Sequence, residues 1–173
     1  MMLEFPWFER KFSFDLPVWM YPNIVERLRG TPARLEELVS GLDRETLTRR
    51  DGDEWSIQEN AGHLWDVEGL WVGRLDDFLN GEPALRAADL TNRKTYEANH
   101  NHNSIENILA AYRKERQTFV ARLDGLDEAD VMRSALHPRL QQKMTVVDHI
   151  YFVAEHDDHH LAQVTRLKRR FTG

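Results

Sequence analysis

The sequence contains no cysteine in its 173 residues. This absence excludes disulfide bonds, thiolate zinc sites, iron–sulfur clusters and cysteine nucleophiles. A metal ion bound by this chain would therefore need histidine, aspartate or glutamate as its ligands. The sequence also has no uncharged apolar run of about 18 residues, so it predicts no membrane-spanning helix.

Positively charged residues are fewer than negatively charged ones, with 23 Lys and Arg and 29 Asp and Glu, and the formal net charge is −6. Nucleic acids and anionic membrane surfaces attract basic faces, so we expect neither as a partner. The first residues lack the basic stretch and apolar run of a signal peptide, and we expect a cytoplasmic protein. The length is close to that of one domain, and we predict a single domain over residues 1–173.

Helical periodicity marks four segments that are separated by turn signals. Gly30-Thr31-Pro32 interrupts the first segment, which is therefore either two helices or one kinked helix. Ser56-Ile57-Gln58-Glu59 is a capping box, with serine at the cap and glutamate three residues later, and it starts the second. The predicted helices span about residues 22–42, 57–80, 104–123 and 145–170, with loops at 82–103 and 124–143.

These segments predict an all-α fold, an up-and-down four-helix bundle with a long crossover connection between the second and third helices. Residues 1–20 are rich in aromatic side chains, and we expect them to form an N-terminal arm over the bundle. A dimer contact or a pocket wall is the functional alternative for this arm. The arm, and the common use of bundle faces for two-fold contacts, favour a homodimer.

Histidine is the residue type that carries most chemical information, since four of the eight histidines fall between positions 149 and 160. Residues four apart lie on one face of a helix, so His156 and His160 form a pair suited to a divalent metal. The apolar stripe of the fourth helix runs beside this pair, which indicates that both face the bundle interior. A hydrogen-bonded core histidine is the alternative at each position.

His63 is the best candidate for a third ligand, because it lies at the edge of the apolar stripe on the second predicted helix. Bundle metal sites use inward side chains from facing helices. Three protein ligands with an open position are typical of catalytic sites, and imidazole ligands suit zinc or nickel. His159 is rotated about 100° from His160 and should not bind, and His149 is the substitute if one ligand is wrong.

Two acids occupy positions where helical periodicity would place apolar side chains, Glu68 on the second predicted helix and Asp157 on the fourth. A buried carboxylate must be paired or hydrogen-bonded, or its pKa rises. In the catalytic interpretation, Glu68 is a general base for metal-bound water, or Asp157 is an acceptor behind the metal ligands. We favour the structural interpretation, in which both acids pair with Arg27, Arg34 or Arg74.

Three blocks of this sequence resemble the DinB/YfiT-like superfamily over roughly residues 20–170. The blocks are residues 27–35 (Arg-Leu-Arg-Gly-Thr-Pro-Ala-Arg-Leu), 55–64 (Trp-Ser-Ile-Gln-Glu-Asn-Ala-Gly-His-Leu) and 156–163 (His-Asp-Asp-His-His-Leu-Ala-Gln). The resemblance implies a four-helix bundle of unusual left-handed connectivity. It also implies that His63, His156 and His160 bind a divalent metal. Members of this superfamily include thiol-dependent S-transferases, an isomerase of the same type and metal-dependent hydrolases.

The leading functional interpretation is an enzyme that activates a thiol or water on a three-histidine metal site and uses it against a small-molecule substrate. A low-molecular-weight thiol would be the cosubstrate in the first case. Inward arginines near the site would favour thiol transfer, whereas Glu68 near the metal would favour hydrolysis. The alternative is a non-catalytic, metal-stabilised bundle or a dimeric module that binds a small ligand.

Overall fold

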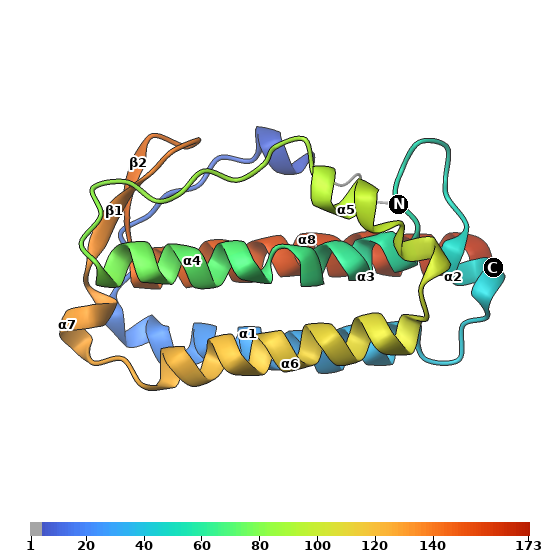
Figure 1. The fold of residues 1–173 in the computed structure, drawn as a ribbon, viewed down its shortest axis with the longest axis horizontal. Coiled ribbons are helices and arrows are strands. Elements are labelled where there is room, and N and C mark those ends of the chain that lie inside the picture. The colour runs from blue at the N-terminus through green and yellow to red at the C-terminus, as the bar shows by residue number, and fades with distance from the viewer. Residues whose placement is uncertain (1–4) are drawn as a thin grey trace.

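The computed structural model describes residues 5–173, and four helical rods dominate it (Figure 1). The first rod is one helix, the second consists of two consecutive helices, and the third and fourth are one helix each. The rods are α1 (Tyr21–Val39), α3 (Ile57–Asp66) with α4 (Glu68–Leu79), α6 (Ile105–Asp124) and α8 (Val146–Thr172). The all-α four-helix bundle that the sequence predicts is thereby confirmed.

The rods are packed so that α1 contacts α6 and α8, while α3 contacts the same two helices from the other side. The α3–α4 rod and α6 run in the same direction, because the chain returns along the length of the bundle between them (Figure 1). This return is the predicted long crossover. It contains the short helix α5 (Arg93–Ala98) and the 3-10 turn η3 (His100–His102), where the sequence analysis expected only loop.

The first predicted segment is a single helix, because α1 continues through Pro32. Proline has no N–H group, so the carbonyl of Leu28, four residues earlier, loses its helical donor. The guanidinium of Arg116 on α6 supplies a replacement, with Nη1 donating to Leu28 O at 3.2 Å. A tertiary contact therefore satisfies the backbone group that the proline leaves free.

The prediction of a loop over residues 124–143 was wrong. This segment contains helix α7 (Glu128–Val131) and two antiparallel strands, β1 (Ser134–His137) and β2 (Gln142–Thr145). Each strand has only four residues, so its two-residue alternation is too short to stand out in the sequence. The hairpin lies at one end of the bundle (Figure 1) and buries alternate side chains, Ala135 and His137 on β1.

The N-terminal arm lies along the bundle and contains two 3-10 turns, η1 (Trp7–Glu9) and η2 (Val18–Met20). Trp7, Phe12 and Phe14 pack on the core, whereas Phe5, Phe8 and Trp19 are exposed. The ring centroid of Trp7 lies 5.2 Å from that of Phe152 on α8. Residues 1–4 of the predicted arm lie outside the described residues. The remaining short helix, α2 (Arg44–Thr48), connects α1 to α3. Within residues 5–173, no helix has the length and apolar character that a membrane span requires.

Candidate metal centre

Three histidines from two rods meet inside the bundle. His63 comes from α3, and His156 and His160 come from successive turns of α8. One ring nitrogen of each lies within 4.8 Å of one nitrogen of the other two. The Nε2 atoms of His63 and His156 are 3.4 Å apart. All three residues are at most 6% exposed, so the cluster is a property of the interior and not of the surface.

Neighbouring side chains fix how two of these rings are oriented. The amide nitrogen of Asn60 donates to Ser56 O at 2.9 Å, so its oxygen faces His160 and accepts from Nδ1 at 2.8 Å. In the same way Nδ1 of His63 lies 3.0 Å from the hydroxyl of Thr95. When each Nδ1 carries the ring proton and donates it to these oxygens, the Nε2 lone pairs of both rings are available to a metal ion. Hydrogen bonds of this kind commonly set the tautomer and orientation of metal-binding histidines.

The electrostatic surroundings keep the three imidazoles neutral. Burial lowers the pKa of His63 to about 4. Burial and the neighbouring imidazoles also hold the pKa values of His156 and His160 well below their usual range. Neutral imidazole is the form that binds metal ions, since the lone pair must be unprotonated. Because three neutral nitrogen donors face one another, a divalent ion fits this donor set.

His159 and His149 lie outside the three-histidine cluster. His159 is half-buried, and its Nε2 accepts from the amide of Gln163 at 2.9 Å. His149 is fully buried, and neither of its ring nitrogens has a hydrogen-bond partner within the described part of the chain. It packs against Trp71 and Phe78, two helical turns from His156. Neither residue contributes a ring nitrogen to the group of three that lie within 4.8 Å of one another.

The histidine cluster forms part of the wall of a cavity of about 780 Å³. A volume of this size is typical of sites for small organic ligands. Three tryptophans line it beside the histidines: Trp7 of the arm, Trp55 before α3 and Trp71 of α4. The ring centroid of Trp55 lies 4.7 Å from that of His63, and the Trp71 centroid lies 5.4 Å from that of His156. The arm therefore supplies a wall of this cavity.

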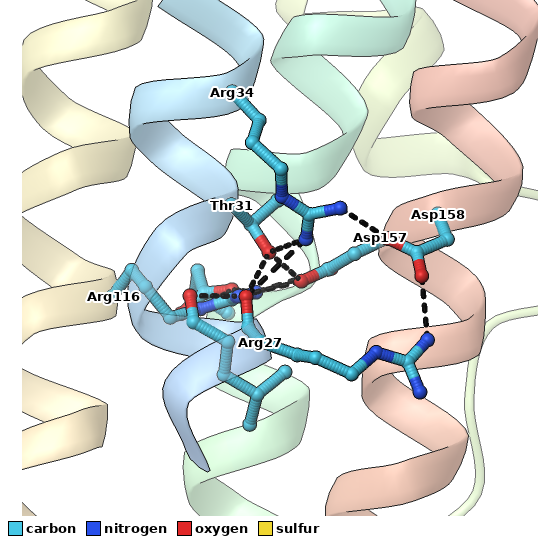
Figure 2. A network of polar contacts seen from close by, with 8 residues as sticks. Arg27, Thr31, Arg34, Arg116, Asp157 and Asp158 are labelled. Atoms are coloured by element: carbon cyan, nitrogen blue, oxygen red, sulfur yellow. Dashed lines mark hydrogen bonds and ion pairs between the residues drawn. The ribbon is translucent and has the colours of Figure 1, made fainter. Parts of the chain in front are cut away.

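The two unusual acids do not reach the cavity, because both are bound to one buried arginine. Arg116 donates Nε and Nη2 to Glu68, with Nη2–Oε1 at 2.6 Å, and donates Nη1 to Asp157 Oδ2 at 2.5 Å. Thr31 adds a further hydrogen bond to Asp157 at 2.9 Å (Figure 2). Both acids are fully buried, and neither lines the cavity. Their contacts support a structural role in pairing α4 and α8 with α6.

The expected partners Arg27, Arg34 and Arg74 were wrong for these acids. Arg27 and Arg34 both bind Asp158 on the outer side of α8 (Figure 2), at 2.5 and 2.7 Å. Arg74 lies in the cavity wall. The sequence did contain a signal for the true partner, since Arg116 occupies a position on the apolar stripe of its helix, between Tyr112 and Phe119. A lone cation on such a stripe indicates a buried acid facing it.

Other contributors to the cavity were missed by the sequence analysis. Trp55 precedes α3, and His137 and Arg139 belong to the hairpin, where helical periodicity carries no information. Thr95 lies on α5, a helix of six residues that is too short to show a periodicity. Asn60 is different, because it precedes His63 by three residues and so shares its helical face. That spacing could have suggested its role beside the histidines.

The fold and the three-histidine centre together define a class of protein, a helical bundle with an interior site suited to a metal. A family model of the DinB superfamily matches residues 27–164. The chain therefore belongs to the DinB superfamily, which confirms the resemblance noted in the sequence.

Individual relatives agree with this assignment. The uncharacterized protein YuaE of Bacillus subtilis (strain 168) is 28% identical over 153 residues, covering 80% of this chain and 94% of YuaE. YfiT from Bacillus subtilis is described as a probable metal-dependent hydrolase with an unusual four-helix bundle topology. Its structure superimposes with a TM-score of 0.79 at 23% identity, over 95% of this chain and 94% of YfiT.

A mycothiol-dependent maleylpyruvate isomerase has a TM-score of 0.68 at 10% identity. The similarity covers 88% of this chain and 63% of that one. At these levels of identity the structural comparisons establish the shared fold.

Proposed function

We propose that this protein is a metal-dependent enzyme that uses a low-molecular-weight thiol as a nucleophile against a small electrophilic substrate. His63, His156 and His160 would hold a divalent ion, with zinc or nickel suited to the three imidazoles. The observation that carries the proposal is the position of this cluster in the wall of a cavity of about 780 Å³. A purely structural metal site needs no such adjoining space.

The chemistry follows from the donor set and from the residues around it. A divalent ion bound there would lower the pKa of a coordinated thiol towards neutrality and polarise an electrophilic group nearby. Thr95 and Asn60 would keep His63 and His160 in the orientation that presents Nε2. Trp7, Trp55 and Trp71 would exclude water and bind the apolar part of the substrate.

Two observations favour a thiol over water as the nucleophile. Glu68, the acid considered as a general base for water, has both carboxylate oxygens bound by Arg116 and lies outside the cavity. Two arginines, Arg74 and Arg139, line the same cavity as the histidines. A thiol cosubstrate with an anionic portion would find its counter-charge there.

The first test is metal content after purification, measured by mass spectrometry on single variants. His63→Ala, His156→Ala and His160→Ala should each lose most of the bound metal. His159→Ala is the matched control, because His159 belongs to the same helix and the same cavity but not to the cluster, and it should retain the metal. Full retention in His63→Ala would contradict the two-helix site.

The second test is activity of the zinc- or nickel-loaded protein with N-acetylcysteine and the fluorogenic electrophile monochlorobimane. We expect a rate above the uncatalysed reaction that is lost on EDTA treatment and in His63→Ala. No acceleration with any of several small thiols and electrophiles would contradict thiol transfer.

Hydrolysis is the second candidate, because the structurally similar YfiT is described as a probable metal-dependent hydrolase. The acid–base partner in that case would be His159, which lines the cavity. Thiol-independent turnover of small esters and amides would favour this function, and in that case His159→Ala should lower kcat while leaving the metal content unchanged.

A further inference from the structure

A second polar cluster lies in the wall of the same cavity. It consists of Arg74 on α4, His137 at the end of β1, and Arg139 in the hairpin turn. Arg74 and His137 are each 2% exposed, and Nη1 of Arg74 lies 3.2 Å from Nε2 of His137. The hairpin therefore places His137 and the half-buried Arg139 beside Arg74 of α4, in one region of the cavity wall.

The two arginines of this cluster have no acidic partner within residues 5–173. Arg74 donates Nε to Arg86 O at 3.1 Å. The two acids that follow it on α4 are bound by other arginines, Asp76 by Arg122 and Asp77 by Arg86. Nη2 of Arg139 is buried and has no hydrogen-bond partner among the described residues. Buried cations are normally paired by direct contact with an acid. Burial lowers the pKa of Arg74 to about 10, and the charges of Arg139 and Arg86 add to this effect against the attraction of Asp77. An unpaired charge of this kind indicates a missing anion.

His137 points to the same conclusion through its hydrogen bonds. Burial and the charges of Arg74 and Arg139 lower the pKa of His137 to about 3, so its ring is neutral and can accept a hydrogen bond at only one nitrogen. Leu140 N lies 3.2 Å from Nδ1, and Nη1 of Arg74 lies 3.2 Å from Nε2. A neutral ring accepts from only one of these two donors. When it accepts from Leu140, Nε2–H and the Nη1–H of Arg74 face each other, and an oxyanion beside them would accept from both.

The acids that line the cavity do not supply this anion. Asp66 is bound to His100 at 2.8 Å, and Asp89 accepts from Thr91 and from the backbone of Arg93. Glu54 is bound by the guanidinium of Arg166. The region around Arg74, His137 and Arg139 consequently has an excess of positive charge.

We propose that Arg74, His137 and Arg139 form a subsite for the carboxylate of a small organic anion that enters the cavity. The planar guanidinium of Arg74 suits carboxylate geometry, and Arg139 adds a second charge-assisted donor. This subsite extends the proposed function. Binding of the carboxylate does not depend on that function, and only the reaction of the bound molecule rests on it. Trp71 joins the two sites, since its ring centroid lies 5.6 Å from the Arg74 guanidinium and 5.4 Å from the His156 ring centroid.

The experiment titrates EDTA-treated protein with succinate and with its neutral analogue succinamide by calorimetry. Succinate should bind and succinamide should not. Arg74→Gln and Arg139→Gln should each weaken succinate binding about 10- to 100-fold, as expected for a lost hydrogen bond between charged groups. Arg122→Gln is the matched control, because this arginine pairs with Asp76 outside the cavity, and it should change the affinity less than twofold.

Variants at a buried arginine also need a folding control. Arg74→Lys keeps the charge but loses the planar donor pair, and it should bind succinate more weakly than wild type and more tightly than Arg74→Gln. Arg139 is half-buried, so its variant should fold even where Arg74→Gln does not. Circular dichroism and the thermal midpoint establish which variants are folded before binding is compared.

His63→Ala separates this inference from the proposed function. Retained succinate binding in His63→Ala, with loss in Arg74→Gln, supports the subsite whether or not the histidines bind metal. The reverse pattern, loss in His63→Ala and wild-type affinity in both arginine variants, overturns the subsite and leaves the metal centre intact. Equal binding of succinate and succinamide overturns it as well.

A second experiment identifies which molecule carries the carboxylate. N-acetylcysteine and N-acetylcysteine amide differ only in this group, and both are offered to the zinc-loaded protein. If wild type prefers the acid about 10-fold and Arg74→Gln removes that preference, the carboxylate belongs to the thiol. If succinate binding depends on Arg74 while the two thiols bind alike, the carboxylate belongs to the other substrate. Either result supports the subsite.

Discussion

The buried arginine Arg116 offers the sharpest test of how this bundle is held together. It uses all five of its N–H groups, on two carboxylates and one backbone carbonyl, in the centre of the protein. Replacing it with methionine would keep much of the side-chain volume but leave Glu68 and Asp157 buried without a counter-ion. The carbonyl of Leu28 would also lose the donor that replaces the proline-blocked helical bond.

The size of the effect follows from these contacts. Removing one partner of a buried ion pair costs about 3–5 kcal/mol, and here two fully buried acids share the single cation. We therefore expect Arg116→Met to lose about 4–5 kcal/mol, a large part of the roughly 5–15 kcal/mol that stabilises a domain. The matched control is Arg122→Met on the same helix, because its ion pair with Asp76 is partly exposed and should contribute less than about 1 kcal/mol.

The assay is urea denaturation followed by tryptophan fluorescence, with EDTA present so that metal binding does not contribute. A triple variant, Arg116→Met with Glu68→Met and Asp157→Asn, removes all three charges and should recover most of the lost stability. Either of two results would refute the reasoning: a single variant within about 1 kcal/mol of wild type, or a triple variant no more stable than Arg116→Met.

Three further predictions concern pH, packing and assembly. Burial raises the pKa of Glu68 to about 7 from an ordinary value near 4.5, so the folded state retains a proton that the unfolded state releases between these values. Wild-type stability should therefore fall relative to that of Glu68→Gln as the pH rises through that window. An equal difference between the urea midpoints of the two proteins at pH 5 and at pH 8 would contradict this. A Cβ at Gly62 would overlap the ring of His100, so Gly62→Ala should lower the stability of the folded state by about 1–3 kcal/mol. Gly69→Ala is the control, because the space around Gly69 is open, and it should not destabilise the protein. Thermal unfolding of both variants checks this prediction. We also expect a homodimer of twice 20.4 kDa in sedimentation velocity, and a monomer at every concentration would rule it out.

The sequence alone determined the parts of this protein that depend on local spacing. The capping box at Ser56 places the start of α3 correctly, although the single helix predicted over residues 57–80 is divided at Val67 into α3 and α4. A four-residue spacing puts His156 and His160 on one face of α8. These features could be predicted because a helix fixes the relative direction of its own side chains from their spacing.

Only the tertiary structure decided which side chains from different elements meet. Spacing shows that Glu68, Arg116 and Asp157 each lie on an inward face, but not that they face one another, because the relative depth and rotation of packed helices depend on the whole core. The polar cluster of Arg74, His137 and Arg139 in the cavity wall is harder still to predict from the sequence. It joins α4 to a hairpin of two four-residue strands, and so short a strand carries too little periodicity to reveal where His137 lies.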